Sequence, residues 1–211
     1  QGGHNALALA HELQAHPQEG FSVTAVAALS GAYNFVSPDF LGIAEQPDVS
    51  HDATVLITFV IFANHTYEMA PASLSAAILP PWPPQIPNLF NGSQSQSEIF
   101  NDFFNCTDCA PLPSQIINTS FLQSVLDDPA NPLAVALNRD QQWNWTPQAA
   151  VELGWSAADD LVPPTQSQQA FAFMSEAGAP VTAITFTGFT HAQAFVPATV
   201  SARHFLDQFR K

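Results

Sequence analysis

The chain has very few basic residues. Only four of its 211 residues are Lys or Arg, against 18 Asp or Glu, so the formal net charge is −14. A surface this acidic repels the phosphate backbone, which argues against nucleic acid as a partner. It is compatible with neutral or cationic substrates.

Long apolar runs are also missing. The longest, at residues 55–63, is much shorter than the roughly 18 residues that a membrane-spanning helix needs, so we expect no integral membrane association. The chain is nevertheless 46% hydrophobic, which predicts a globular fold. Its length suits one domain of ordinary size or one domain that carries an insertion.

Cysteine is scarce, with only Cys106 and Cys109 present. A zinc site needs two further ligands, and the sequence has no second cysteine pair and no clustered histidine pair to supply them. A redox motif would open a helix after a strand, whereas this pair lies in a stretch rich in Phe and Asn. We therefore favour a local disulfide and no metal site. A disulfide implies an oxidising compartment, so the protein is predicted to be secreted or periplasmic.

Helices and strands alternate at both ends of the chain but not in its middle. The apolar spacing predicts a helix at residues 4–16, a strand at 21–29, a strand at 149–154, a helix at 165–177, a strand at 181–187 and a helix at 198–209. This rhythm predicts an α/β fold with a parallel sheet. We interpret residues 36–146 as a mostly helical cap insertion between two parts of the core, residues 1–35 and 147–211.

An acid and a histidine follow two of the predicted strands. Asp159 comes after the strand at 149–154, and His191 lies on the loop after the strand at 181–187. Ligands gather at the carboxyl ends of parallel strands, where a carboxylate can orient an imidazole through Nδ1 and leave Nε2 as a base. Taken singly, each residue could instead be a helix cap or a surface residue. Asp159 is preferred to Asp160, which we interpret as a solvated neighbour or a cap.

Four short motifs connect these residues to a known superfamily. They are Gln1-Gly2-Gly3-His4, Ser30-Gly31-Ala32-Tyr33, Asp159-Asp160-Leu161-Val162-Pro163-Pro164 and Gly188-Phe189-Thr190-His191. With them the chain resembles the α/β-hydrolase superfamily, and within it the secreted lipases and esterases of the secretory lipase (fungal lipase A) type. The resemblance begins just after the nucleophile serine and runs to the C-terminus.

The resemblance implies a Ser-Asp-His triad made by a serine directly before Gln1, by Asp159 and by His191, and it implies no cofactor. Gln1-Gly2 would complete the Gly-x-Ser-x-Gly elbow, so the backbone N–H of Gln1 would be one oxyanion donor. The complete elbow is absent from the chain, and neither Ser30 nor Ser156 lies in one. We therefore expect the chain to be the C-terminal part of a longer polypeptide, with the preceding segment as its partner.

The predicted function is that of a secreted serine esterase or lipase. The insertion is rich in aromatic residues and proline, which favours a hydrophobic acyl or polyester substrate. Trp155 and Trp82 are candidates for the substrate pocket, with core packing as the alternative. A serine exopeptidase of the prolyl-oligopeptidase type and a non-catalytic binding module on the same scaffold stay open as other functions.

Overall fold

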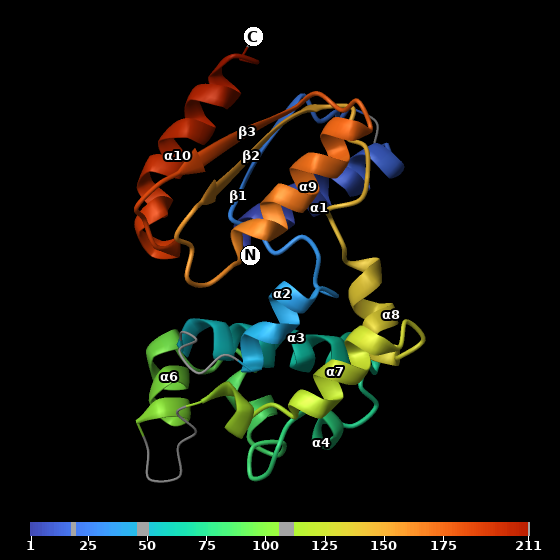
Figure 1. Ribbon diagram of the computed structural model, residues 1–211, viewed down its shortest axis with the longest axis vertical. Helices are drawn as coiled ribbons and strands as arrows, with labels where there is room; N and C mark the ends of the chain where they lie inside the picture. The colour runs from blue at the N-terminus through green and yellow to red at the C-terminus, as the bar shows by residue number, and fades with distance from the viewer. Residues whose placement is uncertain (18–19, 46–50, 106–111, 211) are drawn as a thin grey trace. The chain divides into compact units, whose positions relative to one another are not determined.

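The computed structural model describes residues 1–17, 20–45, 51–105 and 112–210. They form two compact units (Figure 1). Gln1–Phe35 and Asp140–Lys211 make the sheet unit, and Val36–Arg139 make the helical unit. We had expected the chain to return to the core only after residue 146. Residues 140–146 already belong to the sheet unit, because the Gln142 N–H donates to the Tyr33 carbonyl over 2.8 Å and Trp145 is buried in the core of that unit.

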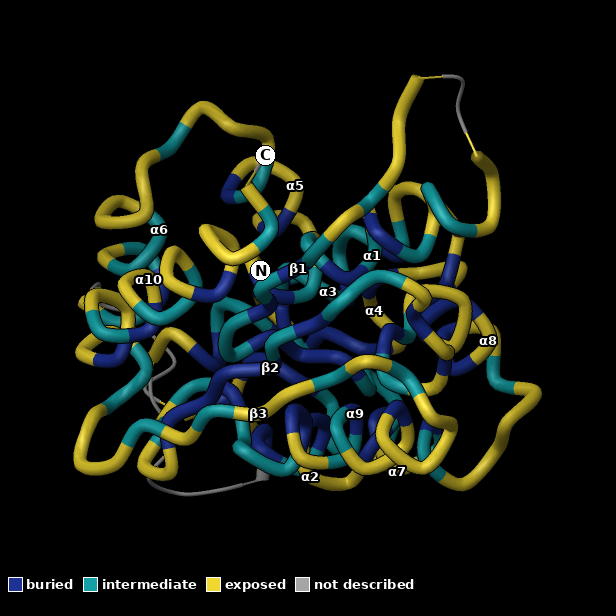
Figure 2. The backbone as a smooth tube through the Cα atoms, turned by 90° about the horizontal axis from the view of Figure 1, so that it is seen from above, coloured by how far each residue is buried: buried dark blue, intermediate teal, exposed yellow. Residues whose placement is uncertain are grey.

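The sheet unit contains a parallel three-stranded sheet in the order β1 (Ala25–Leu29), β2 (Ala150–Ser156) and β3 (Val181–Phe186). The predicted α/β class and parallel sheet are confirmed. The central strand β2 is mostly buried, whereas β3 has only intermediate and exposed residues (Figure 2). All three strands run the same way, so their carboxyl ends meet at one edge of the sheet.

Helices cover both faces of this sheet (Figure 1). α1 (Gly2–Ala15) and α9 (Pro164–Glu176) pack on one face, where Leu7 and Met174 share a core with the β2 residues Val151 and Leu153. α10 (His191–Asp207) lies on the other face, where the Ser201 hydroxyl donates to the Glu152 carboxylate over 3.2 Å. Successive side chains of a strand point to opposite faces of the sheet, so Val151 and Leu153 face α1 and α9 whereas Glu152 faces α10.

The start of α1 lies tightly against the end of β1. A Cβ atom on Gly3 would come within 2.9 Å of the Gly31 nitrogen and still closer to the Leu29 carbonyl oxygen, and one on Gly31 would lie 2.6 Å from the His4 nitrogen. Only glycine allows this backbone approach. The first turn of α1 is therefore fixed at the carboxyl edge of the sheet.

The last helix begins earlier than the sequence suggested. We expected it to start at residue 198, directly after Pro197, and proline disfavours a helix interior. The structure starts it at His191, where Thr190 and Gln193 form a capping box: the Thr190 side chain accepts from the Gln193 N–H, and the Gln193 side chain accepts from the Thr190 N–H. Pro197 is accommodated inside α10, and His191 is a helical residue, not a loop residue.

Within its described part, the helical unit is built from helices, of which only the one at His51–Glu68 is longer than nine residues. They are α2 (Pro38–Leu41), η1 (Gly42–Glu45), α3 (His51–Glu68), α4 (Leu74–Ala77), α5 (Ile86–Leu89), α6 (Gln96–Phe104), η2 (Pro113–Gln115), α7 (Thr119–Asp127) and α8 (Pro132–Arg139). In α3 the residues Ala53, Ile57 and Ile61 recur every four positions and are buried, which is the stripe of a helix packed on one side.

Two α-helices of this unit were not predicted: α5, in a proline-rich stretch that we expected to be extended or irregular, and α6. Helix α6 covers an aromatic stretch that gave no clear helical signal, and its start is set by a capping box between Ser95 and Glu98. The cysteines of the predicted disulfide, Cys106 and Cys109, lie outside the described residues. Within the described ranges, no helix is long and apolar enough to cross a membrane.

Candidate active site

Asp159 and His191 meet at the carboxyl edge of the sheet. The Nδ1 atom of His191 lies 2.9 Å from Asp159 Oδ2 and 3.0 Å from Asp159 Oδ1. The Asp159 side chain is only 1% exposed, whereas the His191 side chain keeps 29% of its surface accessible. An ionised carboxylate can only accept, so Nδ1 carries the hydrogen and Nε2 of the neutral ring is left as an acceptor.

The Asp159 carboxylate is held by its own loop as well as by the ring. Its Oδ1 atom accepts from the backbone N–H of Leu161 over 3.1 Å and from that of Val162 over 2.8 Å. Burial by itself raises the pKa of the Asp159 carboxyl. The hydrogen bonds from His191, Val162 and Leu161 outweigh burial and bring this pKa below its usual value. The site therefore holds an anion that faces an imidazole.

Asp160 also contacts His191, at a different point. Its Oδ1 atom accepts from the His191 backbone N–H over 3.0 Å. We had interpreted Asp160 as a solvated neighbour or a cap. It does cap a helix, but one that begins 31 residues further along the chain. The sequence showed that Asp159 and Asp160 are adjacent carboxylates. It did not show that Asp160 would bind the backbone of His191.

Ser156 joins the acid loop to the histidine loop. It is completely buried at the end of β2, and its hydroxyl donates to the carbonyls of Phe186 and Phe189, which lie just before His191. Both acceptors are backbone oxygens, so the hydroxyl links two loops. Ser156 therefore has a structural role at the end of β2.

Gln1 is the N-cap residue of α1, and its carbonyl accepts from the Asn5 N–H over 2.9 Å. Its side chain is exposed and makes no capping hydrogen bond. Because the first turn of α1 packs on the end of β1, Gln1 stands at the edge of the sheet where β2 and β3 deliver Asp159 and His191. The three predicted site elements therefore share one edge.

The two tryptophans proposed for a substrate pocket have packing roles. Trp155 is 8% exposed and belongs to the core cluster of the sheet unit. Val151, Leu153 and Trp155 are two residues apart along β2. The strand period of two therefore places Trp155 on the same buried face as the other two. Trp82 is 3% exposed in the helical unit, and its ring lies 5.0 Å from that of Phe103. Core packing, the alternative we kept, accounts for both.

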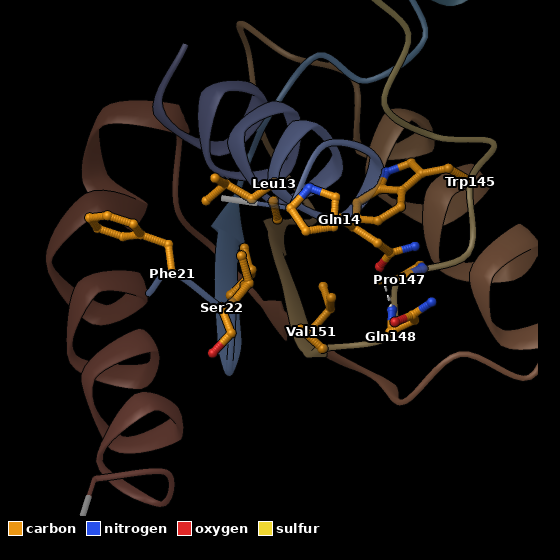
Figure 3. A pocket seen from close by; sticks show the side chains of 13 residues that line it. Leu13, Gln14, Phe21, Ser22, Trp145, Pro147, Gln148 and Val151 are labelled. Carbon is orange, nitrogen blue, oxygen red and sulfur yellow. Dashed lines mark hydrogen bonds between the residues drawn. The ribbon is translucent and has the colours of Figure 1, made fainter. Parts of the chain in front are cut away.

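A cavity of about 200 Å³ lies at the other end of the sheet unit (Figure 3). Its walls come from the second half of α1 and from residues at the starts of β1 and β2, among them Leu13, Gln14, Val26, Trp145 and Val151. The Gln14 side chain is already used, since it accepts from the Gln148 N–H over 2.8 Å and donates to the Thr146 carbonyl over 3.0 Å. Because these are the amino ends of the strands, the cavity is separate from Asp159 and His191.

Comparison with solved structures identifies the fold. The rice cell wall degrading esterase LipA from Xanthomonas oryzae is 25% identical and superimposes with a TM-score of 0.80 over 99% of this chain and 57% of LipA. A Legionella pneumophila protein whose hydrolase activity is inferred is 18% identical, with a TM-score of 0.84 over 100% of this chain and 54% of its own. No family model matches the chain, and no curated protein matches it significantly.

These likenesses and the parallel sheet show that the chain has the α/β-hydrolase fold. The chain spans little more than half the length of either structure. Each of them therefore contains a large segment that has no counterpart among these 211 residues.

Proposed function

We propose that the protein is a carboxylic ester hydrolase that works through a Ser-Asp-His triad. The observation that carries this proposal is the hydrogen bond between His191 Nδ1 and the buried Asp159 carboxylate at the carboxyl edge of the sheet. The α/β-hydrolase fold and the 25% identity to the esterase LipA support it. A histidine oriented in this way is a general base for a hydroxyl nucleophile.

The proposed nucleophile is a serine directly before Gln1. In an elbow of the Gly-x-Ser-x-Gly kind, the serine stands on the turn between a strand and the helix behind it. Helix α1 has the features of that helix, because Gly2 and Gly3 open it and its first turn packs on the carboxyl end of β1. The backbone N–H of Gln1 is then the proposed oxyanion donor, since the residue after the nucleophile fills that role.

In the proposed reaction His191 Nε2 takes the serine proton as Oγ attacks the ester carbonyl. The resulting imidazolium is stabilised by Asp159, and it gives the proton to the departing alkoxide. Water then attacks the acyl-enzyme with His191 again as the base, which releases the acid and restores the serine. Asp159 stays ionised throughout, in keeping with the hydrogen bonds that lower the pKa of its carboxyl.

We further propose that residues preceding Gln1 complete the sheet. Among the described residues β1 pairs only with β2, and its sequence Ala-Val-Ala-Ala-Leu has no charge to protect the open edge. Phe21 near β1 and Leu9 on α1 are 72% and 61% exposed. If a further strand pairs there, amide hydrogen exchange will be slow at every β1 residue. Fast exchange at alternate residues would contradict the pairing.

The proposed substrate is an ester of a hydrophobic acid, polyesters included, and the proposed location is outside the cytoplasm. LipA is described as degrading the rice cell wall, which lies outside the cell. Two assays test the substrate class. One compares the turnover of p-nitrophenyl octanoate with that of p-nitrophenyl acetate, and the other measures the release of acid from a polyester film. Preference for the acetate with no release from the film would contradict it.

A fluorophosphonate probe tests the catalytic proposal directly. We expect the protein to be labelled on the serine before Gln1 and the His191→Ala variant to lose both labelling and ester turnover. His204→Ala is a matched control, because His204 is an exposed histidine on the same helix; it should keep both. A protein that folds but neither reacts with the probe nor hydrolyses esters would overturn the proposal.

A further inference from the structure

Two consecutive carboxylates bind the same histidine at two points. Asp159 accepts from the ring Nδ1, and Asp160 accepts from the backbone N–H of His191 over 3.0 Å. We propose that Asp160 is a positioning residue that holds the backbone of His191 while Asp159 holds its ring. This inference rests on the proposed function, because it assigns a role in the same site.

The two contacts constrain different degrees of freedom. The bond to Asp159 fixes the rotation of the imidazole about its side-chain torsions, but that bond alone would follow any movement of the His191 backbone. The bond to Asp160 ties that backbone to the acid loop. Because the two carboxylates are neighbours in the chain, one short segment holds both the ring and the backbone of His191.

That segment is itself well anchored. Asp159 Oδ1 accepts from the N–H groups of Leu161 and Val162, and the buried Ser156 hydroxyl donates to the Phe189 carbonyl. The acid loop and the residues before His191 are thus joined independently of Asp160. A general base loses rate steeply when it is misplaced, and a displacement of about 1 Å can cost a factor of roughly 100.

Asp160 also completes the capping of α10. His191 is the first residue of this helix, and the first N–H groups of a helix have no acceptor within it. Thr190 accepts from the N–H of Gln193. Asp160 accepts from the N–H of His191, so a second donor of the same first turn is satisfied by the acid loop.

Steady-state kinetics on Asp160→Ala and Asp160→Asn test this role. The alanine variant loses the acceptor, so kcat should fall on the order of tenfold with little change in KM. Asparagine keeps an acceptor oxygen at the same place, so it should restore kcat to within about threefold of the parent. A purely structural role of Asp160 would instead lower the thermal stability of Asp160→Ala. In that case Asp160→Asn would not recover kcat when the two variants are compared at equal stability.

Glu98→Ala is the matched control, because Glu98 is another exposed acid that accepts from a backbone N–H at a helix start, in the helical unit. It should leave kcat unchanged. An Asp160→Ala variant with the parent kcat, or one whose loss asparagine does not recover, would overturn the inference while the proposed function stands. A parent protein without fluorophosphonate labelling or ester turnover would instead overturn the proposed function.

Discussion

The paired glycines at the start of α1 give a sharp test of the packing at the carboxyl edge. Gly3 is buried against the end of β1, whereas Gly2 is exposed with no heavy atom within 4 Å of where its Cβ would be. Alanine at the two neighbouring positions should therefore act in opposite directions. Gly3→Ala is the perturbation, and Gly2→Ala is its control.

The magnitude follows from the atoms that the new methyl group would meet. At Gly3 they are the Leu29 carbonyl oxygen and the Gly31 nitrogen, the latter at 2.9 Å. Both are backbone atoms, so α1 must move away from β1. Overpacking of this kind costs about 1–3 kcal/mol, and the better helix propensity of alanine returns at most about 1 kcal/mol. At Gly2 only that gain applies. Because the gain is common to both variants, we expect them to differ by the overpacking cost of about 1–3 kcal/mol.

Thermal and denaturant unfolding of both variants measure this difference. For a protein of this size, 2 kcal/mol corresponds to roughly 4–8 °C in Tm. Gly3→Ala should melt below the parent, and Gly2→Ala should melt at the parent temperature or slightly above it. If Gly3→Ala is as stable as Gly2→Ala, the close approach of α1 to β1 is refuted.

Two further predictions concern buried polar groups. Asp159→Asn should lower kcat by about 10⁴ because the amide disfavours the required tautomer. The carboxyl pKa of Asp159 lies below the unfolded value of about 3.9, so its contribution to stability is present above pH 4 and is lost as the pH falls through the folded pKa. The difference in unfolding free energy between parent and variant should therefore shrink from pH 7 to pH 3, and a constant difference would contradict it. Gln166 is fully buried, and its Oε1 accepts from the Tyr33 and Asn34 N–H groups over 3.1 and 2.8 Å. Gln166→Leu should cost about 2 kcal/mol or more in denaturant unfolding, whereas the same change at the exposed Gln168 should cost little.

The sequence was informative where a pattern is local. The alternation of Val181 to Phe186 and the helical spacing in α1 are properties of neighbouring residues, and they predicted the parallel α/β class. Asp159 and His191 could be expected to meet because parallel strands bring their carboxyl ends to one edge, whatever the detailed packing. Trp155 could have been assigned to the core from the same strand period.

Elements whose limits depend on distant contacts were predicted less well. No local pattern indicated that residues 140–146 belong with the sheet, because Gln142 and Trp145 are held there by Tyr33 and His11, more than 100 residues earlier. Nor did it show that α10 would continue through Pro197. There the capping box at Thr190 and packing on the sheet outweigh the lost hydrogen bond.

By itself, then, the sequence determined the order of helices and strands in the sheet unit and the edge of the sheet at which the acid and the histidine stand. Both follow from side-chain periods and chain direction, which a short window of residues contains. Tertiary structure alone decided that Asp160 reaches the His191 backbone and that Ser156 ties the two loops together. Those bonds join groups about 30 residues apart, and only packing of the strands and α10 brings such groups within hydrogen-bonding distance.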